Sequence, residues 1–312
     1  LIDVDGQNKF PNLALMKLSA WYKLRGDIVE WYMPFSERYD IVYCAKVFSF
    51  TPDFDECINA DKVIYGGSGY QIQLQNGKEV WNNKSEKKNF LQTLPTHIEH
   101  LYPDYSLYPD LTNNTAYGYL TRGCPRNCAF CHVAAKEGRK SVKVAELSEF
   151  WRGQKNICLL DPNLLACKEH TALLQDLINS NAYIDFTQGL DARLLTKTNC
   201  ELLAQIKVKQ IHFAWDKYDD KDRILPKLAM FTKYRYKGKN PDHNAIVYVL
   251  VNFDTTFKQD LERIYTLRNM GYWAYVMIYN KEHCNHKYKR LQRWCNNRLI
   301  FSRCAKFEDY KS

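Results

Sequence analysis

One short stretch of the chain holds three closely spaced cysteines, Cys124, Cys128 and Cys131. A disulfide framework needs cysteines in pairs, and a zinc site usually takes a fourth ligand nearby. His132 is the direct neighbour of Cys131 and is therefore poorly placed to join the same tetrahedron. Thiolates are the usual ligands of iron–sulfur clusters. We therefore interpret the stretch as a loop that binds three irons of a four-iron cluster and leaves one iron open.

The Cys-x3-Cys-x2-Cys spacing, with Phe130 before the last cysteine, resembles the radical S-adenosylmethionine (radical SAM) superfamily. The resemblance implies a [4Fe-4S] cluster on the three cysteines, with SAM bound to the open iron beside Phe130. Reduction of the cluster would then cleave SAM to methionine and a 5′-deoxyadenosyl radical. It also implies an electron donor such as a reductase, flavodoxin or ferredoxin. Three unrelated cysteines or a zinc knuckle remain the alternative.

From residue 115 the chain alternates strand-like and helix-like segments, which predicts six β/α units. The expected strands are 115–121, 157–160, 183–186, 210–215, 245–252 and 273–279. The expected helices are 144–152, 168–179, 197–206, 222–235, 256–269 and 286–296. The radical SAM domain is a partial six-stranded barrel of this kind. The resemblance therefore implies a partial (β/α)6 barrel within residues 111–312, with a C-terminal extension.

Ligands of parallel α/β folds bind where the strands end. The polar residues expected at those ends are Asp161, Asn163, Gln188, Asp191, Arg193, Asp216 and Asn252. By resemblance, residues 160–163 take the place that contacts the SAM amino group, although the usual Gly-Gly-Glu is absent. Residues 188–193 take the place that holds the SAM ribose and carboxylate. Asn252 replaces the usual glycine of the strand on the adenine side.

Each of these strand-end residues also has a purely structural interpretation. The guanidinium of Arg193 suits a bidentate contact with the SAM carboxylate, but Asp191 could instead pair with Arg193. Asp161, followed by Pro162, could simply cap the next helix. The sequence leaves these alternatives open.

Residues 1–110 predict a separate, Rossmann-like parallel sheet. The expected elements are strands 1–5, 27–32, 41–47 and 62–65, and a helix over 12–24 that ends at Gly26. The stretch resembles the cobalamin-binding-like domain found ahead of many radical SAM domains, so cobalamin is a further candidate cofactor. No histidine precedes His97, so the usual cobalt-ligating histidine is missing. The glycines of 66–69 fit either a tight turn or a loop that faces a cofactor.

Between the two domains, residues 71–112 read as a linker with a turn at Asn76-Gly77. The linker would end in an ordered, aromatic strap across the next domain. Among the remaining cysteines, Cys44 lies in an apolar run and is expected in the core. Three more, Cys284, Cys295 and Cys304, are too far apart in sequence to predict a second cluster without a further partner.

The net charge of +9 is unevenly distributed along the 312 residues. Residues 1–110 hold 11 Lys and Arg against 15 Asp and Glu, a net charge of −4, whereas residues 111–312 hold 33 against 20, a net charge of +13. The basic half, with Arg122 and Arg126 beside the cysteines, suits an anionic substrate or a nucleic acid. Basic and aromatic residues alternate in 233–239 and 287–290, as in nucleic-acid binders, although solvated helix ends give the same pattern.

These features predict an enzyme that starts radical chemistry, by hydrogen abstraction or methyl transfer, on a substrate that the sequence does not identify. The alternatives are an RNA- or nucleotide-modifying enzyme of the same chemistry and a non-enzymatic iron–sulfur or zinc module that binds nucleic acid. A cluster motif favours a reducing cytoplasm. We expect no signal peptide, because a strand-like segment starts the sequence, and no membrane span, because the longest strong apolar run is 245–251.

Overall fold

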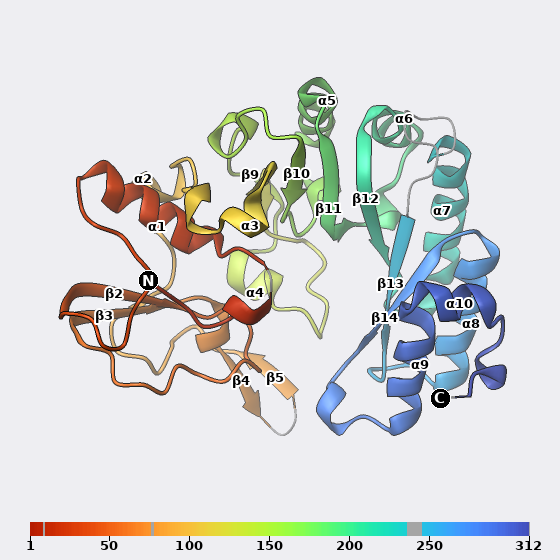
Figure 1. Ribbon diagram of the computed structural model, residues 1–312. Helices are drawn as coiled ribbons and strands as arrows, with labels where there is room; N and C mark the ends of the chain where they lie inside the picture. The colour runs from red at the N-terminus through yellow and green to blue at the C-terminus, as the bar shows by residue number, and fades with distance from the viewer. Residues whose placement is uncertain (9, 76–77, 236–244, 312) are drawn as a thin grey trace. The chain divides into compact units, whose positions relative to one another are not determined.

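The computed structural model describes residues 1–8, 10–75, 78–235 and 245–311 (Figure 1). The chain forms two compact units. Unit 1 comprises residues 1–118, 127–136 and 145–154, and unit 2 comprises residues 119–126, 137–144 and 155–312. Our domain boundary at residue 110 stays a prediction. Within the described residues, no helix is both long and apolar enough to span a membrane.

Unit 1 contains a four-stranded parallel sheet. Its strands, in spatial order, are β1 (Ile2–Asp3), β2 (Tyr39–Ala45), β3 (Ala60–Gly66) and β6 (Phe90–Leu91). Helix α1 (Leu13–Leu24) begins at Asn12, whose side chain accepts a hydrogen bond from the Leu15 amide. Gly26 follows its end with φ of +88°, as the C-terminal glycine signal predicts.

Two apolar clusters form the core of unit 1. One joins α1 to the sheet through Leu15, Met16 and Ala45. The other includes Val42 and Cys44, and Cys44 is only 1% exposed, which confirms the prediction that it is a core residue.

The expected strand over 27–32 is wrong. This segment makes two backbone hydrogen bonds to Leu1, one from Tyr32 and one to Glu30, and β1 is too short to extend the ladder. Ile28 is 93% exposed, so the apolar residues of the segment do not all enter a core.

The expected linker over 71–112 is also largely structured. It contains the antiparallel pair β4 (Ile72–Gln75) and β5 (Lys78–Trp81) as well as β6, while the turn predicted at Asn76-Gly77 lies outside the described residues. The strap that follows forms α2 (Thr96–Glu99) and α3 (Pro109–Thr112). It lies against α1, where Asp104 accepts hydrogen bonds from Ser19 (2.6 Å) and Lys23 (2.7 Å).

The second sheet has six parallel strands in chain order. These are β7 (Thr115–Gly118), β10 (Asn156–Leu159), β11 (Tyr183–Leu190), β12 (Lys207–Ala214), β13 (Ala245–Val251) and β14 (Trp273–Ile278). The helices of this region are α5 (His170–Ser180), α6 (Lys197–Gln205), α7 (Lys221–Arg235), α8 (Phe257–Asn269), α9 (His286–Asn296) and α10 (Arg298–Arg303). The predicted alternation of strands and helices from residue 156 onward is therefore confirmed.

The order of elements around the cysteine motif differs from the prediction. Residues 144–152 form only a single 3-10 turn, η4 (Leu147–Glu149), because the capping box of Glu146 and Glu149 closes that turn and no helix continues from it. A short helix, α4 (Val133–Glu137), follows the cysteines, and β8 (Thr121–Arg122) pairs with β9 (Val142–Lys143).

The other 3-10 turns are η1 (Gly6–Asn8), η2 (Ser68–Tyr70), η3 (Tyr105–Leu107), η5 (Leu164–Ala166), η6 (Ala192–Leu194), η7 (Tyr218–Asp220), η8 (Lys281–His283) and η9 (Phe307–Asp309).

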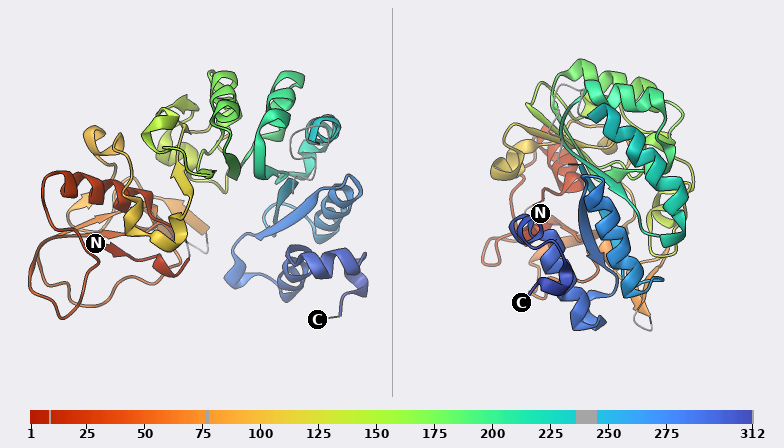
Figure 2. Two further views of the ribbon diagram at one scale, coloured as in Figure 1. Left: turned by 45° about the horizontal axis from the view of Figure 1, so that its top comes forward. Right: turned by 90° about the vertical axis from the view of Figure 1, so that its right-hand side faces the viewer.

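Within unit 2, helices α5 to α8 cover one face of the sheet (Figures 1 and 2). Phe213 of β12 packs edge-on against Phe231 of α7 on that face, with ring centroids 5.1 Å apart. Helix α9 contributes Asn296, whose side chain accepts a hydrogen bond from the Val276 amide (2.7 Å) and donates one to the Val276 carbonyl (3.0 Å). These bonds satisfy backbone groups of β14, the last strand of the sheet.

Candidate functional site

The cysteine motif divides between the two units. Cys124 belongs to unit 2, where its backbone amide donates to the Gly138 carbonyl (3.1 Å). Gly123 has φ of +87°, and a Cβ there would lie 2.1 Å from the Lys140 carbonyl oxygen, so only glycine fits before the first cysteine. Cys128 and Cys131 belong to unit 1, where the Cys131 amide donates to the Cys128 carbonyl (3.0 Å).

The donor chemistry of the three cysteines fits an iron–sulfur cluster. Cys131 is exposed, whereas Cys124 and Cys128 are half-buried. In the part of the chain that the structure describes, no three His, Cys, Asp or Glu side chains are grouped closely enough to hold a metal ion. Phe130 is half-buried beside the third cysteine.

Asn163 lies beside the first cysteine. Its Nδ2 donates to Cys124 Sγ at 3.4 Å, and its backbone carbonyl accepts a hydrogen bond from Ser141 Oγ (2.8 Å). The residue is 3% exposed, and its Oδ1 is buried without a hydrogen-bond partner among the described residues. A buried amide oxygen left without a donor is costly, so this atom could accept a hydrogen bond from a ligand.

Asp161, two residues earlier, serves the local structure. Its carboxylate accepts hydrogen bonds from the Leu120 amide (3.1 Å) and from the Thr121 amide (2.6 Å) and hydroxyl (2.7 Å). Burial raises the pKa of Asp161 to about 6 despite these bonds. Through these hydrogen bonds Asp161 connects the end of β10 to the segment that precedes Cys124. Its predicted contact with SAM stays a prediction.

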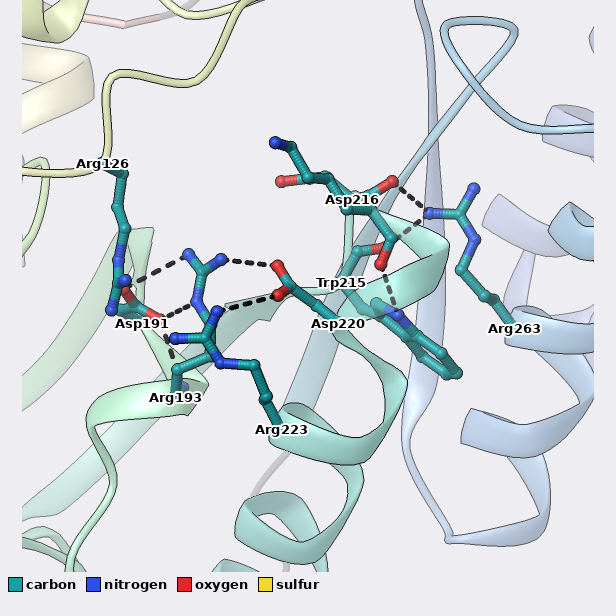
Figure 3. A network of polar contacts seen from close by, with 9 residues as sticks. Arg126, Asp191, Arg193, Trp215, Asp216, Asp220, Arg223 and Arg263 are labelled. Atoms are coloured by element: carbon teal, nitrogen blue, oxygen red, sulfur yellow. Dashed lines mark hydrogen bonds and ion pairs between the residues drawn. The ribbon is translucent and has the colours of Figure 1, made fainter.

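A network of arginines and carboxylates occupies the ends of β11 and β12 (Figure 3). Arg193 donates to both oxygens of Asp191 (2.8 and 3.3 Å) and to Asp220 (2.7 Å). Arg126, from the segment between the first two cysteines, also donates to Asp191 (2.5 Å), and Arg223 reaches Asp220 (3.4 Å). The pairing of Asp191 with Arg193 that the sequence left open is therefore present.

The electrostatics of this network keep Asp191 ionised. Burial alone would raise the pKa of Asp191, but the hydrogen bonds and charge of Arg193, together with Arg126, hold that pKa below its ordinary value. Likewise burial would lower the pKa of Arg193, but Asp191 and Asp220 raise it. A ligand carboxylate could bind Arg193 only by sharing it with these two side chains or by displacing one of them.

Asp216 follows β12 and is half-buried. Its carboxylate accepts a hydrogen bond from the Leu250 amide (3.2 Å), and its backbone carbonyl accepts one from Arg263 (2.7 Å). Burial raises the pKa of Asp216 to about 6. Arg263 is itself fully buried and also donates to the Trp215 carbonyl (2.7 Å; Figure 3). A further hydrogen bond joins Arg263 to the Leu250 carbonyl (2.7 Å).

The last two predicted residues of the site differ in exposure. Gln188, near the end of β11, is exposed. Asn252 has φ of +63°, a left-handed conformation that glycine and asparagine tolerate best, and its Nδ2 donates to the Tyr279 carbonyl (2.9 Å). This conformation explains in physical terms why an asparagine is suited to position 252. The contacts of both residues with SAM stay predictions.

The sequence reasoning missed polar side chains inside the strands. Cys158 and Asp185 are paired in register on β10 and β11, and Asp185 Oδ1 is buried without a hydrogen-bond partner in the described structure. Burial raises the pKa of Asp185 to about 6. The imidazole of His212 stacks on the ring of Tyr248 (4.9 Å between centroids, 8° between planes), and Tyr248 donates to the Thr187 carbonyl (3.0 Å).

His212 is held as a neutral imidazole. Its Nδ1 lies 3.0 Å from the Phe186 carbonyl, which can only accept, so Nδ1 carries the proton. Burial lowers the pKa of His212. Polar residues alternating with apolar ones in strands 183–190 and 207–214 were the available sequence signal, because period-two alternation places such groups on one face.

The loops after β1, β2 and β3 meet at one edge of the first sheet, as predicted for parallel strands. Asp5 accepts hydrogen bonds from the Val47 amide and the Thr51 hydroxyl (2.5 Å for the latter), and Ser68 donates to the Val47 carbonyl (3.0 Å). At Gly67, with φ of +100°, a Cβ would lie 2.2 Å from the Lys46 carbonyl oxygen. Close packing of this turn therefore explains the glycine without a cofactor.

The basic stretches and the C-terminal cysteines have local partners. Lys287 lies over the rings of Phe257 (4.9 Å) and Tyr288 (5.4 Å), whereas residues 236–239 of the other stretch lie outside the described residues.

The C-terminal thiols donate to three different backbone carbonyls, Cys284 to Lys281, Cys295 to Ala274 and Cys304 to Lys306. These separate surroundings give no support to a second cluster.

Comparisons with known proteins do not assign the chain. A scan against models of protein families gives no match, and a search of curated proteins gives none.

Proposed function

We propose that the protein is a radical SAM enzyme that binds a [4Fe-4S] cluster through Cys124, Cys128 and Cys131. The observation that carries the proposal is the cysteine motif together with Asn163, whose amide reaches Cys124 Sγ at 3.4 Å from the loop after β10. Thiolates three and four residues apart suit this cluster type. With SAM bound, the cluster would supply a 5′-deoxyadenosyl radical for hydrogen abstraction or methyl transfer.

The residues of this chain would bind and orient the cofactor. Asn163 Oδ1, buried without a partner among the described residues, suits a donor such as the SAM amino group. Arg193 would bind the SAM carboxylate, and Gln188 and Asp191 the ribose, with Asn252 on the adenine side and Phe130 beside the cluster. Arg126 and Arg122 add positive charge next to the thiolates, which favours an anionic cluster.

The six-stranded parallel sheet supports a partial (β/α)6 barrel as the finer description of the cofactor-binding part. Its polar groups Asp185, His212 and Tyr248 would then line the substrate site. The substrate itself is unidentified. The donor of electrons would be a reductase, flavodoxin or ferredoxin, and the enzyme would work in the reducing cytoplasm.

The four-stranded parallel sheet of unit 1 supports a Rossmann-like, cobalamin-binding-like domain. A cobalamin held there would have no histidine of this domain below its cobalt. Purification with hydroxocobalamin, followed by a visible spectrum, tests this role. Loss of the corrin absorbance on desalting would show that the domain does not bind the cofactor, and methyl transfer through cobalt would be withdrawn.

The experiment that tests the proposed function is anaerobic loading of the protein with iron and sulfide, followed by SAM and dithionite. We expect 5′-deoxyadenosine and methionine in equal amounts, measured by liquid chromatography and mass spectrometry. A protein that binds iron but leaves SAM intact would contradict the proposal and favour a non-enzymatic iron–sulfur or zinc module.

The net charge of +13 over residues 111–312 favours a nucleic acid as the substrate class among the alternatives. A salt-dependent shift of tRNA by the loaded protein would support an RNA-modifying enzyme of the same chemistry. No shift at low salt would exclude it.

A further inference from the structure

The two polar atoms of the Asn163 side-chain amide have different surroundings. Its Nδ2 donates to Cys124 Sγ at 3.4 Å, within the range for a hydrogen bond to sulfur, while Oδ1 has no partner among the described residues. The side chain is almost fully buried, so water does not compete for either atom. The sulfur is therefore the group that fixes the direction of this amide.

Both partners of this contact have anchored backbones. The Ser141 hydroxyl donates to the Asn163 carbonyl, and the Ala166 amide does so as well (3.2 Å). On the other side, the Cys124 amide donates to Gly138, and the close approach of Gly123 to Lys140 leaves no room for a side chain. The N–H···S contact is thus set by the fold of unit 2 and does not depend on Cys128 or Cys131.

We infer that Asn163 is a positioning residue that stabilises the Cys124 thiolate by an N–H···S hydrogen bond and so raises the reduction potential of the cluster. The inference rests on the proposed function, because it requires a cluster on Cys124. A donor to a ligating sulfur withdraws electron density from the cluster and favours its reduced, more negative state. In this way one buried amide would make the first electron transfer easier.

The test is the midpoint potential of the loaded cluster, measured by redox titration followed by electron paramagnetic resonance. Asn163→Leu removes the donor in a side chain of similar size, and Asn163→Asp replaces it with an acceptor. We expect a more negative potential in both variants, with the larger shift in N163D. Asn179→Asp, the same chemical change at an exposed position of α5, serves as the control and should leave the potential unchanged.

A second measurement needs no variant. Wild-type protein grown with asparagine labelled with ¹⁵N at the side-chain amide should show a ¹⁵N coupling to the reduced cluster by pulsed magnetic resonance. Absence of this coupling, or unchanged potentials in N163L and N163D with full iron content, would overturn the inference. Failure of wild-type protein to bind any cluster would instead refute the proposed function, so the two failures are distinguishable.

Discussion

Two arginine networks lie at neighbouring strand ends of unit 2, and they differ in solvent exposure and in the number of carboxylate partners. Arg263 is 0% exposed and directs its guanidinium to the Trp215, Asp216 and Leu250 carbonyls. The carboxylate of Asp260, which is also 0% exposed, accepts a hydrogen bond from Arg263 at 2.5 Å. The ion pair of Arg263 and Asp260 is therefore closed to solvent.

The network around Arg193 contains more carboxylate and remains accessible. The side chain of Arg193 is 21% exposed, and its partners Asp191 and Asp220 each have a second arginine nearby, Arg126 and Arg223. Each of these carboxylates would therefore keep one arginine partner if its contact with Arg193 were lost. The comparison teaches that the arginines at strand ends divide into those closed off in the fold, such as Arg263, and those still accessible to solvent, such as Arg193.

The largest expected effect is a difference in the free energy of unfolding between variants of Arg263 and of Arg193. Arg263→Met should lower the free energy of unfolding by about 3–5 kcal/mol, because it leaves the Asp260 carboxylate buried without its cation. Arg193→Met should lower it by only about 1–2 kcal/mol, since Arg126 and Arg223 still neutralise the two carboxylates. Urea unfolding of both variants measures the difference. Equal losses would mean that the Arg193 network is as structural as the Arg263 network.

Much of the fold could be predicted from the sequence, because buried parallel strands and amphipathic helices have distinct periods. Strand β13 and helix α8 match their predicted ranges to within a residue at each end. The sequence does not predict β6, because two residues are too few to show the alternation of apolar and polar side chains that marks a strand. It wrongly predicts a strand over 27–32, because an apolar run does not show whether the neighbouring strand is long enough to pair with it.

The sequence predicted where the residues of the candidate site lie in the fold better than it predicted their hydrogen-bond partners. Strand ends correctly located Asp191, Arg193 and Asp216, because turns after parallel strands share one edge of the sheet. The pairing of Arg126 with Asp191 joins residues 65 positions apart, which spacing cannot reveal. Residues 160–163 are expected from the sequence to contact the SAM amino group, whereas the hydrogen bond from Asn163 to Cys124 could be seen only in the structure.

A smaller effect concerns Asp216, which lies next to both arginines. Its pKa of about 6 in the folded protein exceeds that of an exposed aspartate, 3.8, because it is buried. The folded state therefore binds the proton more tightly, and the stability from this group is complete below pH 4 and lost as the pH rises to about 6. We expect that Asp216→Asn, which cannot ionise, removes this loss of stability between pH 4 and pH 6.

The measurement is urea unfolding of both proteins between pH 4 and pH 7. The free energy of unfolding of D216N, relative to wild type, should rise by about 2–3 kcal/mol over this range. A constant difference between the two proteins would show that Asp216 is not protonated preferentially in the folded state.

The smallest effect tests the proposal that Arg193 binds SAM. Arg193→Ala should weaken SAM binding to the loaded protein about tenfold or more, about 1.4 kcal/mol, through loss of a charge-assisted contact with the carboxylate. Arg223→Ala removes a more exposed arginine of the same network and should leave the affinity unchanged. Calorimetry measures both, and equal affinities in wild type and R193A would remove Arg193 from the site.

The central claim is that Cys124, Cys128 and Cys131 together bind one cluster. The most direct measurement is the iron content and visible absorbance of the triple alanine variant after anaerobic loading. A matched variant, Cys57→Ala/Cys284→Ala/Cys304→Ala, removes three other cysteines that are not buried. We predict that the first variant loses the brown chromophore and the bound iron, while the second keeps both. Retention of iron and absorbance by the first variant would contradict the account.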